Sequence, residues 1–204
     1  LPVEWRNPRL RSAMKPSIYL ASNSPRRREL LRQIGVHFDV LLFRSGARAD
    51  ADVDETAHAD EPAHDYVQRV ALAKAEGGMR RVHWRHLPPR PVLAADTTIE
   101  LDGRIIGKPV DAADAARILQ QLSGRSHQVL TAVALSDGER TAHCLNVNTV
   151  DFRALDPDDI RRYIATGEPM DKAGAYGIQG RAAMFIESIH GSYTGIMGLP
   201  LYET

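Results

Sequence analysis

The sequence contains a single cysteine, Cys144, among its 204 residues. An intramolecular disulfide is therefore excluded, a cysteine-based zinc site is not expected, and a reducing cytoplasm is the expected compartment. No apolar run approaches the roughly 18–20 residues that cross a bilayer, so we expect no membrane association. Lys+Arg and Asp+Glu balance at 26 each. Zero net charge argues against a general nucleic-acid binder, because such domains are usually strongly basic.

Lysine is also scarce, since only four of the 26 basic residues are lysines. Genomic base composition explains such an excess of arginine. Hydrophobic residues make up 43% of the chain and charged residues 25%, as in ordinary globular proteins. The length predicts a single domain, which we place at residues 17–204 and expect to consist of two lobes. Residues 1–16 are expected to be a tail or an upstream extension without a secretory signal.

Hydrophobic periodicity and turn residues predict interleaved strands and helices, and thus an α/β fold with a mixed twisted sheet flanked by helices. The two longest strands are joined by a hairpin, which argues against a purely parallel sheet. Gly77-Gly78 is expected to end the second helix and to be followed by a loop over residues 79–90. The predicted strands cover residues 18–22, 38–43, 92–95, 128–135, 142–152 and 183–197, and the predicted helices cover 24–34, 63–76, 111–122 and 156–166.

Residues 22–31 (SNSPRRRELL) place a tight turn and a helix N-terminus directly after a strand. Ser24 is a candidate N-cap, and Pro25 suits the first helical position. Free N–H groups and the positive end of the helix dipole favour a phosphate at such a site. The arginines that follow, Arg26 and Arg27 among them, oppose the dipole unless an anion is present. This pattern predicts a polyphosphate clamp, with an exposed charged helix start as the alternative.

Two further segments carry residues suited to phosphate chemistry. Asp96 lies in Ala-Asp-Thr-Thr at the end of a predicted apolar strand, where an α/β sheet can hold a ligand, a metal or an activated water. The alternative is a simple strand-end turn. Lys108 lies between glycine and proline on a rigid turn suited to contacting a phosphate.

Residues 167–180 contain four glycines, which favours an irregular loop whose backbone can approach a ligand. The loop contains Lys172, another candidate phosphate ligand, but matches neither the P-loop nor the Rossmann pattern. The acidic run at residues 50–65 and the Arg/His-rich run at residues 77–90 are typical of solvated segments. His83 and His86 form the only close histidine pair, and no further ligands accompany them to make a metal site.

In combination these segments resemble the Maf family of nucleotide pyrophosphatases, from about residue 17 to residue 204. The motif that ends with Gln179 resembles the branch that acts on dTTP and UTP, whereas a sister branch acts on 7-methyl-GTP. The resemblance implies an elongated two-lobed fold with a central cleft, related in shape to inosine triphosphate pyrophosphatases. The motifs that carry it are LASNSPRRRELL, VDET, YVQRVALAKA, AADTTIELDGRIIGKP, LSGRSHQVLTAVAL and DKAGAYGIQG.

The resemblance also implies roles for individual residues. Asp96 would be the general base, and Glu55 and Lys74 would lie near the catalytic water and a divalent metal, Mg²⁺ or Mn²⁺. Glu55 and Asp96 would be the metal ligands. The residues implied to hold the triphosphate are Ser24, Arg26, Arg27 and Lys108, and those implied to set base selectivity are Arg26, Thr97 and Gln179.

The expected function is hydrolysis of a nucleoside triphosphate, dTTP or UTP, to the monophosphate and pyrophosphate. Such an enzyme would remove unwanted nucleotides from the cytoplasmic pool, and the resemblance implies a homodimer. Two alternatives remain open: a 7-methyl-GTP pyrophosphatase, and a non-catalytic regulator of cell division, as the family's older name of septum formation inhibitor suggests.

Overall fold

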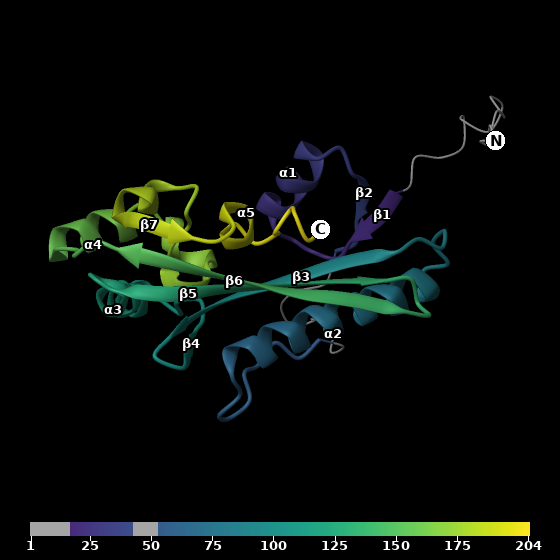
Figure 1. Cartoon of the computed structure of the whole chain (residues 1–204), viewed down its shortest axis with the longest axis horizontal. Helices are drawn as coiled ribbons and strands as arrows, with labels where there is room; N and C mark the ends of the chain where they lie inside the picture. The colour runs from purple at the N-terminus through teal and green to yellow at the C-terminus, as the bar shows by residue number, and fades with distance from the viewer. Residues whose placement is uncertain (1–16, 43–52) are drawn as a thin grey trace, which may run out of the picture.

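The computed structural model describes residues 17–42 and 53–204. The predicted tail at residues 1–16 and the end of the predicted strand 38–43 lie outside the described residues. A single seven-stranded sheet runs along the molecule (Figure 1). Its strands are β1 (Ser17–Leu20), β2 (His37–Val40), β3 (Val92–Leu101), β4 (Arg104–Ile106), β5 (Ser126–Ser136), β6 (Thr141–Phe152) and β7 (Ile186–His190), and the helices are α1 (Pro25–Gln33), α2 (Ala63–Trp84), α3 (Ala112–Leu122), α4 (Pro157–Ile164) and α5 (Tyr193–Ile196).

The sheet is mixed, as the sequence predicts. Its order is β2-β1-β3-β5-β6-β7, with β4 paired to β3. Strand β1 runs parallel to both β2 and β3, and every other pairing is antiparallel. No helix among the described residues is long and apolar enough to cross a membrane.

The two faces of the sheet are covered differently. Helix α2 lies along one face, whereas α1 and α5 lie on the other (Figure 1). Because side chains alternate along a strand, the even-numbered residues of β3 face α2 and the odd-numbered ones face the opposite side of the sheet, where α1 lies. Ala94 accordingly packs in the α2 cluster, while Leu93 and Ala95 pack with Leu30 of α1.

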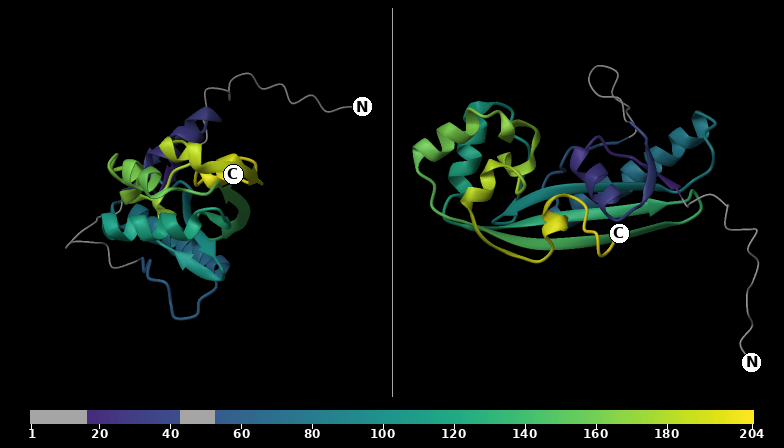
Figure 2. Two further views of the ribbon diagram at one scale, coloured as in Figure 1. Left: turned by 90° about the vertical axis from the view of Figure 1, so that its left-hand side faces the viewer. Right: turned by 90° about the horizontal axis from the view of Figure 1, so that it is seen from above.

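The face opposite α2 carries two separate hydrophobic clusters. Viewed from above, α3 and α4 gather over one end of the sheet, and α1 lies over the other part (Figure 2). Ala95 of β3 belongs to the α1 cluster, and Ile99 belongs to the cluster of α3 and α4. Thr97 lies between these two positions on the same face, and so at the junction of the clusters.

Helix α2 does not end at Gly77-Gly78, and residues 79–84 are helical rather than part of the predicted loop. Glycine in a helix interior costs about 1 kcal/mol relative to alanine, which made it a plausible terminator. Here the glycine serves packing, since a Cβ on Gly78 would lie 2.6 Å from Val92 Cγ1. The missing side chain lets α2 lie close to β3.

The prediction of one strand over residues 183–197 is also wrong in part. A 3₁₀ helix covers Arg181–Phe185, β7 covers Ile186–His190, and α5 follows. The strand ends because Gly191 adopts a φ of +118°, where a Cβ would meet Asn148 Oδ1 at 2.4 Å. Ser192 then caps α5 by accepting a hydrogen bond from Gly195 N.

His127 is a titratable residue within the apolar core. Its side chain is packed edge-on against Phe152 and Tyr176, and the residue is only 3% exposed. Burial lowers the pKa of His127 from 6.5 to about 4, and the charge of Asp151 opposes part of this shift. The folded protein therefore keeps this imidazole neutral at neutral pH.

This shift predicts a pH-dependent stability. Between pH 6.5 and about 4 the unfolded chain binds a proton at His127 that the folded chain excludes, so this contribution is complete above pH 6.5 and is lost as the pH falls. Between pH 7 and pH 5 the wild type should lose about 2 kcal/mol of unfolding free energy more than His127→Gln. Urea unfolding at both pH values measures this difference, and equal losses would contradict the assignment.

Candidate functional site

Three of the predicted catalytic residues converge on the α2 face of the sheet. Lys74 Nζ lies 2.8 Å from Asp96 Oδ1 and 3.1 Å from Glu55 Oε2. The side chains of Lys74 and Asp96 are 14% and 12% exposed, whereas that of Glu55 is 57% exposed. One ammonium group therefore faces two carboxylates, one inside the fold and one at its surface.

The two contacts of Lys74 differ in strength for this reason. An exposed ion pair contributes about 0–1 kcal/mol, because water screens it. Removing one partner of a buried pair costs about 3–5 kcal/mol, because the other charge is left desolvated. Lys74 is thus firmly held by Asp96, while Glu55 can exchange Lys74 for another cation at little cost.

Lys74 reaches Asp96 because it lies on the inner stripe of α2. Helical positions three and four residues apart share one face, and Asp96 faces the same helix from the centre of β3. Asp96 Oδ2 makes no hydrogen bond to any described residue, so one carboxylate oxygen remains available. The other members of the stripe are apolar and fully buried: Val67, Val70, Ala71 and Ala75.

Arg69, which sequence reasoning missed, holds the segment that carries Glu55. Its guanidinium pairs with both carboxylate oxygens of Glu61, at 2.7 and 2.8 Å, and this hydrogen bonding lowers the pKa of Glu61 from 4.5 to about 2. It also donates to the carbonyl oxygens of Asp54, at 3.0 Å, and Thr56, at 2.8 Å. These contacts join residues 8 to 15 positions apart, a spacing without a local sequence signal.

Tyr66 fixes the same segment from a neighbouring position on α2. Its hydroxyl donates to the carbonyl oxygen of Glu55 at 3.0 Å. Burial, together with the charges of Asp96 and Glu55, raises the pKa of Tyr66 to about 12. The phenol therefore stays protonated and remains a donor across the physiological range.

Ser24 caps α1 as predicted, and Arg27 in the first turn is bonded into the fold. The Ser24 hydroxyl accepts a hydrogen bond from Arg27 N. The Arg27 guanidinium donates to Gly198 O at 2.7 Å, to Ser22 Oγ at 3.2 Å and to Thr97 Oγ1 at 3.1 Å. Arg27 thereby links α1, the centre of β3 and the C-terminal segment.

The contact with Thr97 continues through the sheet in a fixed direction. Thr131 donates its only hydroxyl proton to Gly195 O at 2.8 Å, so Thr97 must donate to Thr131 Oγ1, 2.9 Å away. Arg27 in turn donates to Thr97. The Thr97 proton is therefore committed within the fold, and its hydroxyl can offer a substrate only its remaining acceptor lone pair.

The side chains of Glu55, Lys74 and Asp96 (the Asp96 group) and those of Arg27 and Thr97 (the Arg27 group) lie on opposite faces of β3. The sheet is nevertheless open between the two groups. Along one edge of β3, strand β1 pairs only with Val92 and Leu93, and β4 pairs only with residues 99–101. On that edge, residues 94–98 have no partner strand among those described. The two charges influence each other: burial lowers the pKa of Arg27, and the carboxylate of Asp96 opposes this shift.

Three other predicted binding residues have side chains that are not bonded to the described part of the fold. Arg26, Lys108 and Gln179 form no hydrogen bond or ion pair with the part of the chain that the structure describes. Lys108 and Gln179 are exposed. Arg26 lies close enough to Asp171 to add to the lowering of its pKa, which is mainly due to the hydrogen bond from Lys172.

Lys172 is not brought to the Asp96 group. Its Nζ donates to Glu168 O at 2.7 Å and to Asp171 Oδ1 at 2.6 Å, within its own loop. Its role as a phosphate ligand stays a prediction. The structure thus unites Glu55, Lys74 and Asp96, places Arg27 against Thr97, and leaves Lys172 engaged elsewhere.

A family model for Maf-like protein matches residues 17–204, a range that contains all of the described residues. The chain belongs to the Maf family. A 70% identical relative is the dTTP/UTP pyrophosphatase of Aromatoleum aromaticum, matched over 94% of this chain and 95% of that protein. The dTTP/UTP pyrophosphatase of Dechloromonas aromatica is 58% identical over 92% and 93% of the two chains. The sequence resemblance is thereby confirmed.

The solved structure of the Staphylococcus aureus Ham1 protein is a more distant match to this Maf chain. The match covers 67% of this chain and 71% of the Ham1 chain, with 20% sequence identity and a TM-score of 0.45.

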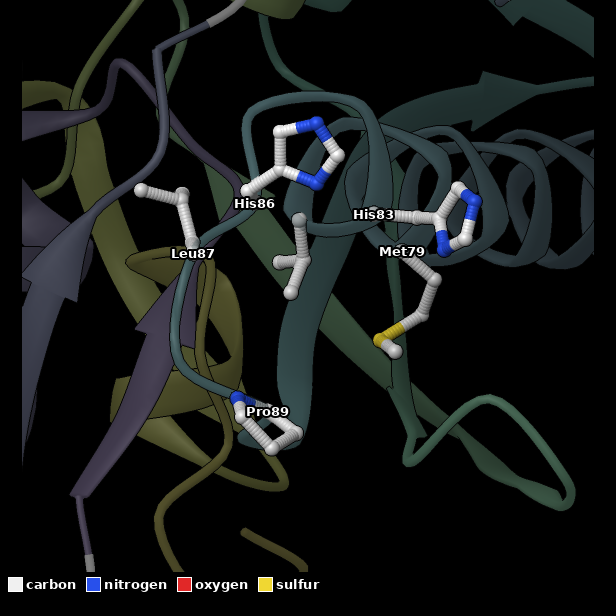
Figure 3. A pocket seen from close by; sticks show the side chains of 6 residues that line it. Met79, His83, His86, Leu87 and Pro89 are labelled. Atoms are coloured by element: carbon white, nitrogen blue, oxygen red, sulfur yellow. The ribbon is translucent and has the colours of Figure 1, made fainter.

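The Arg/His-rich run of this Maf protein forms the last turns of α2 and continues past the end of that helix. A pocket of about 310 Å³ forms where α2 ends, and His83 and His86 line it together with Met79, Leu87 and Pro89 (Figure 3). Among the described residues no group of three or more His, Cys, Asp or Glu side chains is arranged to hold a metal ion.

Because Lys74 contacts both Glu55 and Asp96, we expect the three side chains to act together in catalysis. Lys74→Met leaves the Asp96 carboxylate without its cation, and Glu55→Gln removes the second carboxylate. We expect each variant to lower kcat for dTTP hydrolysis at least tenfold, and the double variant to lose far less than the product of the two losses. Steady-state kinetics of the four proteins tests this, with thermal melting as the folding control. Multiplicative losses would mean that the residues act independently.

Proposed function

We propose that this Maf protein hydrolyses dTTP and UTP to the nucleoside monophosphate and pyrophosphate. The observation that carries the proposal is the Glu55–Lys74–Asp96 group, which lies beside an opening in the sheet flanked by the arginine-bearing start of α1. The names of relatives that match over more than nine-tenths of the chain support dTTP and UTP as the substrates.

Asp96 is the proposed general base. Lys74 holds one of its oxygens, Oδ1, and the other oxygen is left to accept a proton from water. The water oxygen attacks the α-phosphorus, the bond from that phosphorus to the bridging oxygen breaks, and pyrophosphate leaves with the electron pair. A positioned base of this kind contributes about 10²–10⁴-fold to the rate.

The start of α1 is the proposed site of the leaving pyrophosphate. The positive end of the helix dipole favours an anion there, and the N–H of Arg26 makes no hydrogen bond to any described residue, whereas Pro25 has no N–H and that of Arg27 is capped by Ser24. Arg26 and Lys108 supply positive charge that no described residue neutralises by an ion pair. We place the nucleotide between the α1 cluster and the cluster of α3 and α4, which would be the two lobes, with Thr97 at their junction.

Glu55 and Asp96 fit a divalent metal, because their carboxylates already converge on one cation, the ammonium of Lys74. Mg²⁺ in nucleotide enzymes is usually bound by one or two carboxylates together with substrate phosphates. When bound, Mg²⁺ or Mn²⁺ would neutralise charge on the phosphate oxygens. The homodimer and the cytoplasmic location stay predictions.

Product analysis tests the reaction. Incubation with dTTP and Mg²⁺ should yield dTMP and pyrophosphate in equal amounts, and Asp96→Asn should lower kcat by at least 100-fold while nucleotide binding is largely retained. Release of dTDP and orthophosphate would overturn attack at the α-phosphorus. No turnover of any nucleotide would favour the non-catalytic regulator, and preferential turnover of 7-methyl-GTP would favour the sister branch.

Gln179 is proposed to read the base. Thymine and uracil present an acceptor at O4 and a donor at N3, which a glutamine amide complements, whereas cytosine reverses this pattern. An unpaired buried polar group costs about 1–3 kcal/mol, so kcat/KM should favour dTTP over dCTP at least tenfold. Gln179→Glu should lower the dTTP:dCTP ratio, because a carboxylate cannot donate to O4. An unchanged ratio would remove Gln179 from the base site.

A further inference from the structure

His127 is a buried polar residue for which the proposed reaction has no use. Its Nε2 lies 2.7 Å from the hydroxyl oxygen of Tyr176, and its Nδ1 is buried and has no hydrogen-bond partner within the described part of the chain. The ring is otherwise surrounded by aromatic carbon: its centroid lies 5.1 Å from that of Phe152 and 5.4 Å from that of Tyr176.

A histidine at this position carries a cost that an apolar residue would avoid. A buried polar atom without a partner costs about 1–3 kcal/mol, and a phenyl ring of similar size would fill the same space. The one hydrogen bond that the His127 side chain makes to the described residues is therefore what a phenyl ring could not provide. It supplies the only hydrogen-bond partner, among the described residues, of a Tyr176 hydroxyl that is itself buried.

Tyr176 is the buried anchor of the glycine-rich segment, residues 172–180. The segment has little regular structure of its own: Gly174 and Ala175 both lie in the left-handed region, with φ of +67° and +58°. A Cβ on Gly174 would lie 2.3 Å from Ile99 Cδ1, so the backbone lies directly on β3. Without regular structure, the position of such a segment depends on its anchors.

The positions of two side chains that are proposed to face the substrate, Gln179 and Lys108, depend on this anchor. Gln179 lies three residues after Tyr176, and its side chain is exposed. Two residues before Tyr176, Gly174 N donates to Gly107 O at 2.9 Å, which ties the segment to the turn that carries Lys108. Movement of Tyr176 would therefore displace both the proposed base-reading amide and a proposed phosphate ligand.

We propose that His127 is a positioning residue for the nucleotide site: by hydrogen bonding to Tyr176 it fixes the glycine-rich segment so that Gln179 and Lys108 face the substrate. The inference rests on the proposed function of these two residues. His127 itself does not contact the nucleotide.

The test separates positioning from core filling. His127→Phe keeps a ring but removes the hydrogen bond, Tyr176→Phe removes only the hydroxyl oxygen, and His127→Gln retains a polar group at the same reach. We expect both phenylalanine variants to raise KM for dTTP at least fivefold and to lower the dTTP:dCTP ratio of kcat/KM, with kcat within threefold of wild type. His127→Gln should restore most of the loss.

Coupling and controls make the result decisive. The double variant His127→Phe/Tyr176→Phe should resemble either single variant, because both remove one interaction. Folded Tyr176→Phe with KM within twofold of wild type and an unchanged ratio overturns the inference, even if His127→Phe does not fold. Gln179→Glu is measured alongside. If it lowers the ratio and Tyr176→Phe does not, this inference alone fails; if wild type does not hydrolyse dTTP, the proposed function fails.

Discussion

The contact between Lys74 and Asp96 sets the depth and direction of the site. An ammonium and a carboxylate that are both about seven-eighths covered must stay paired, because either charge alone would lose several kcal/mol of solvation. The pair therefore fixes how α2 lies on β3. Packing supports the same arrangement, since the absence of a side chain at Gly78 lets the helix approach Val92. Charge pairing and close packing thus act on the same two elements.

Around this contact, some side chains of the site are fixed by hydrogen bonds within the fold, and others are held loosely enough to bind a substrate. Arg27, Thr97 and Thr131 form a directed chain of hydrogen bonds that ends at a carbonyl oxygen of the C-terminal segment. Arg69 and Tyr66 hold the backbone on either side of Glu55 and at Glu55 itself. The Glu55 carboxylate, by contrast, is held among the described residues only by its exposed contact with Lys74. A rigid backbone with a loosely held carboxylate is suited to a ligand that arrives with the nucleotide.

Much of this was predictable where the signal is local. The N-cap at Ser24 and the long β5–β6 hairpin follow from residue spacing and turn chemistry. The predicted strand 92–95 is too short, because β3 covers Val92–Leu101 and Asp96 lies in the middle of that strand and not at its end. The failures came where a distant contact overrode a local preference. Gly77-Gly78 has the composition of a helix end, yet the packing of α2 on β3 keeps it helical.

The site residues show the same division. The convergence of Glu55, Lys74 and Asp96 was expected from the family resemblance, because 41 positions separate the first from the last and no spacing rule connects them. Arg69 was missed because its partners are carbonyl oxygens of another segment, and carbonyl oxygens have no sequence signature. Nothing in the sequence around Tyr176 indicates that its hydroxyl meets a histidine on β5.

The side chains of Arg26 and Lys108 form no hydrogen bond or ion pair with any described residue. Arg26 adds positive charge at the start of α1, where the helix already presents the positive end of its dipole, and this is unfavourable in the absence of an anion. A fold that retains such an arrangement must tolerate the repulsion, within a stability of only about 5–15 kcal/mol. A triphosphate would convert that repulsion into attraction, so binding energy is concentrated where the leaving group would lie. Arg27 cannot serve in the same way unless it gives up bonds to Gly198, Ser22 or Thr97. Its geometry therefore suits holding the opening between the clusters, while Arg26 and Lys108, which form no ion pair with any described residue, are the groups we propose to meet the phosphates.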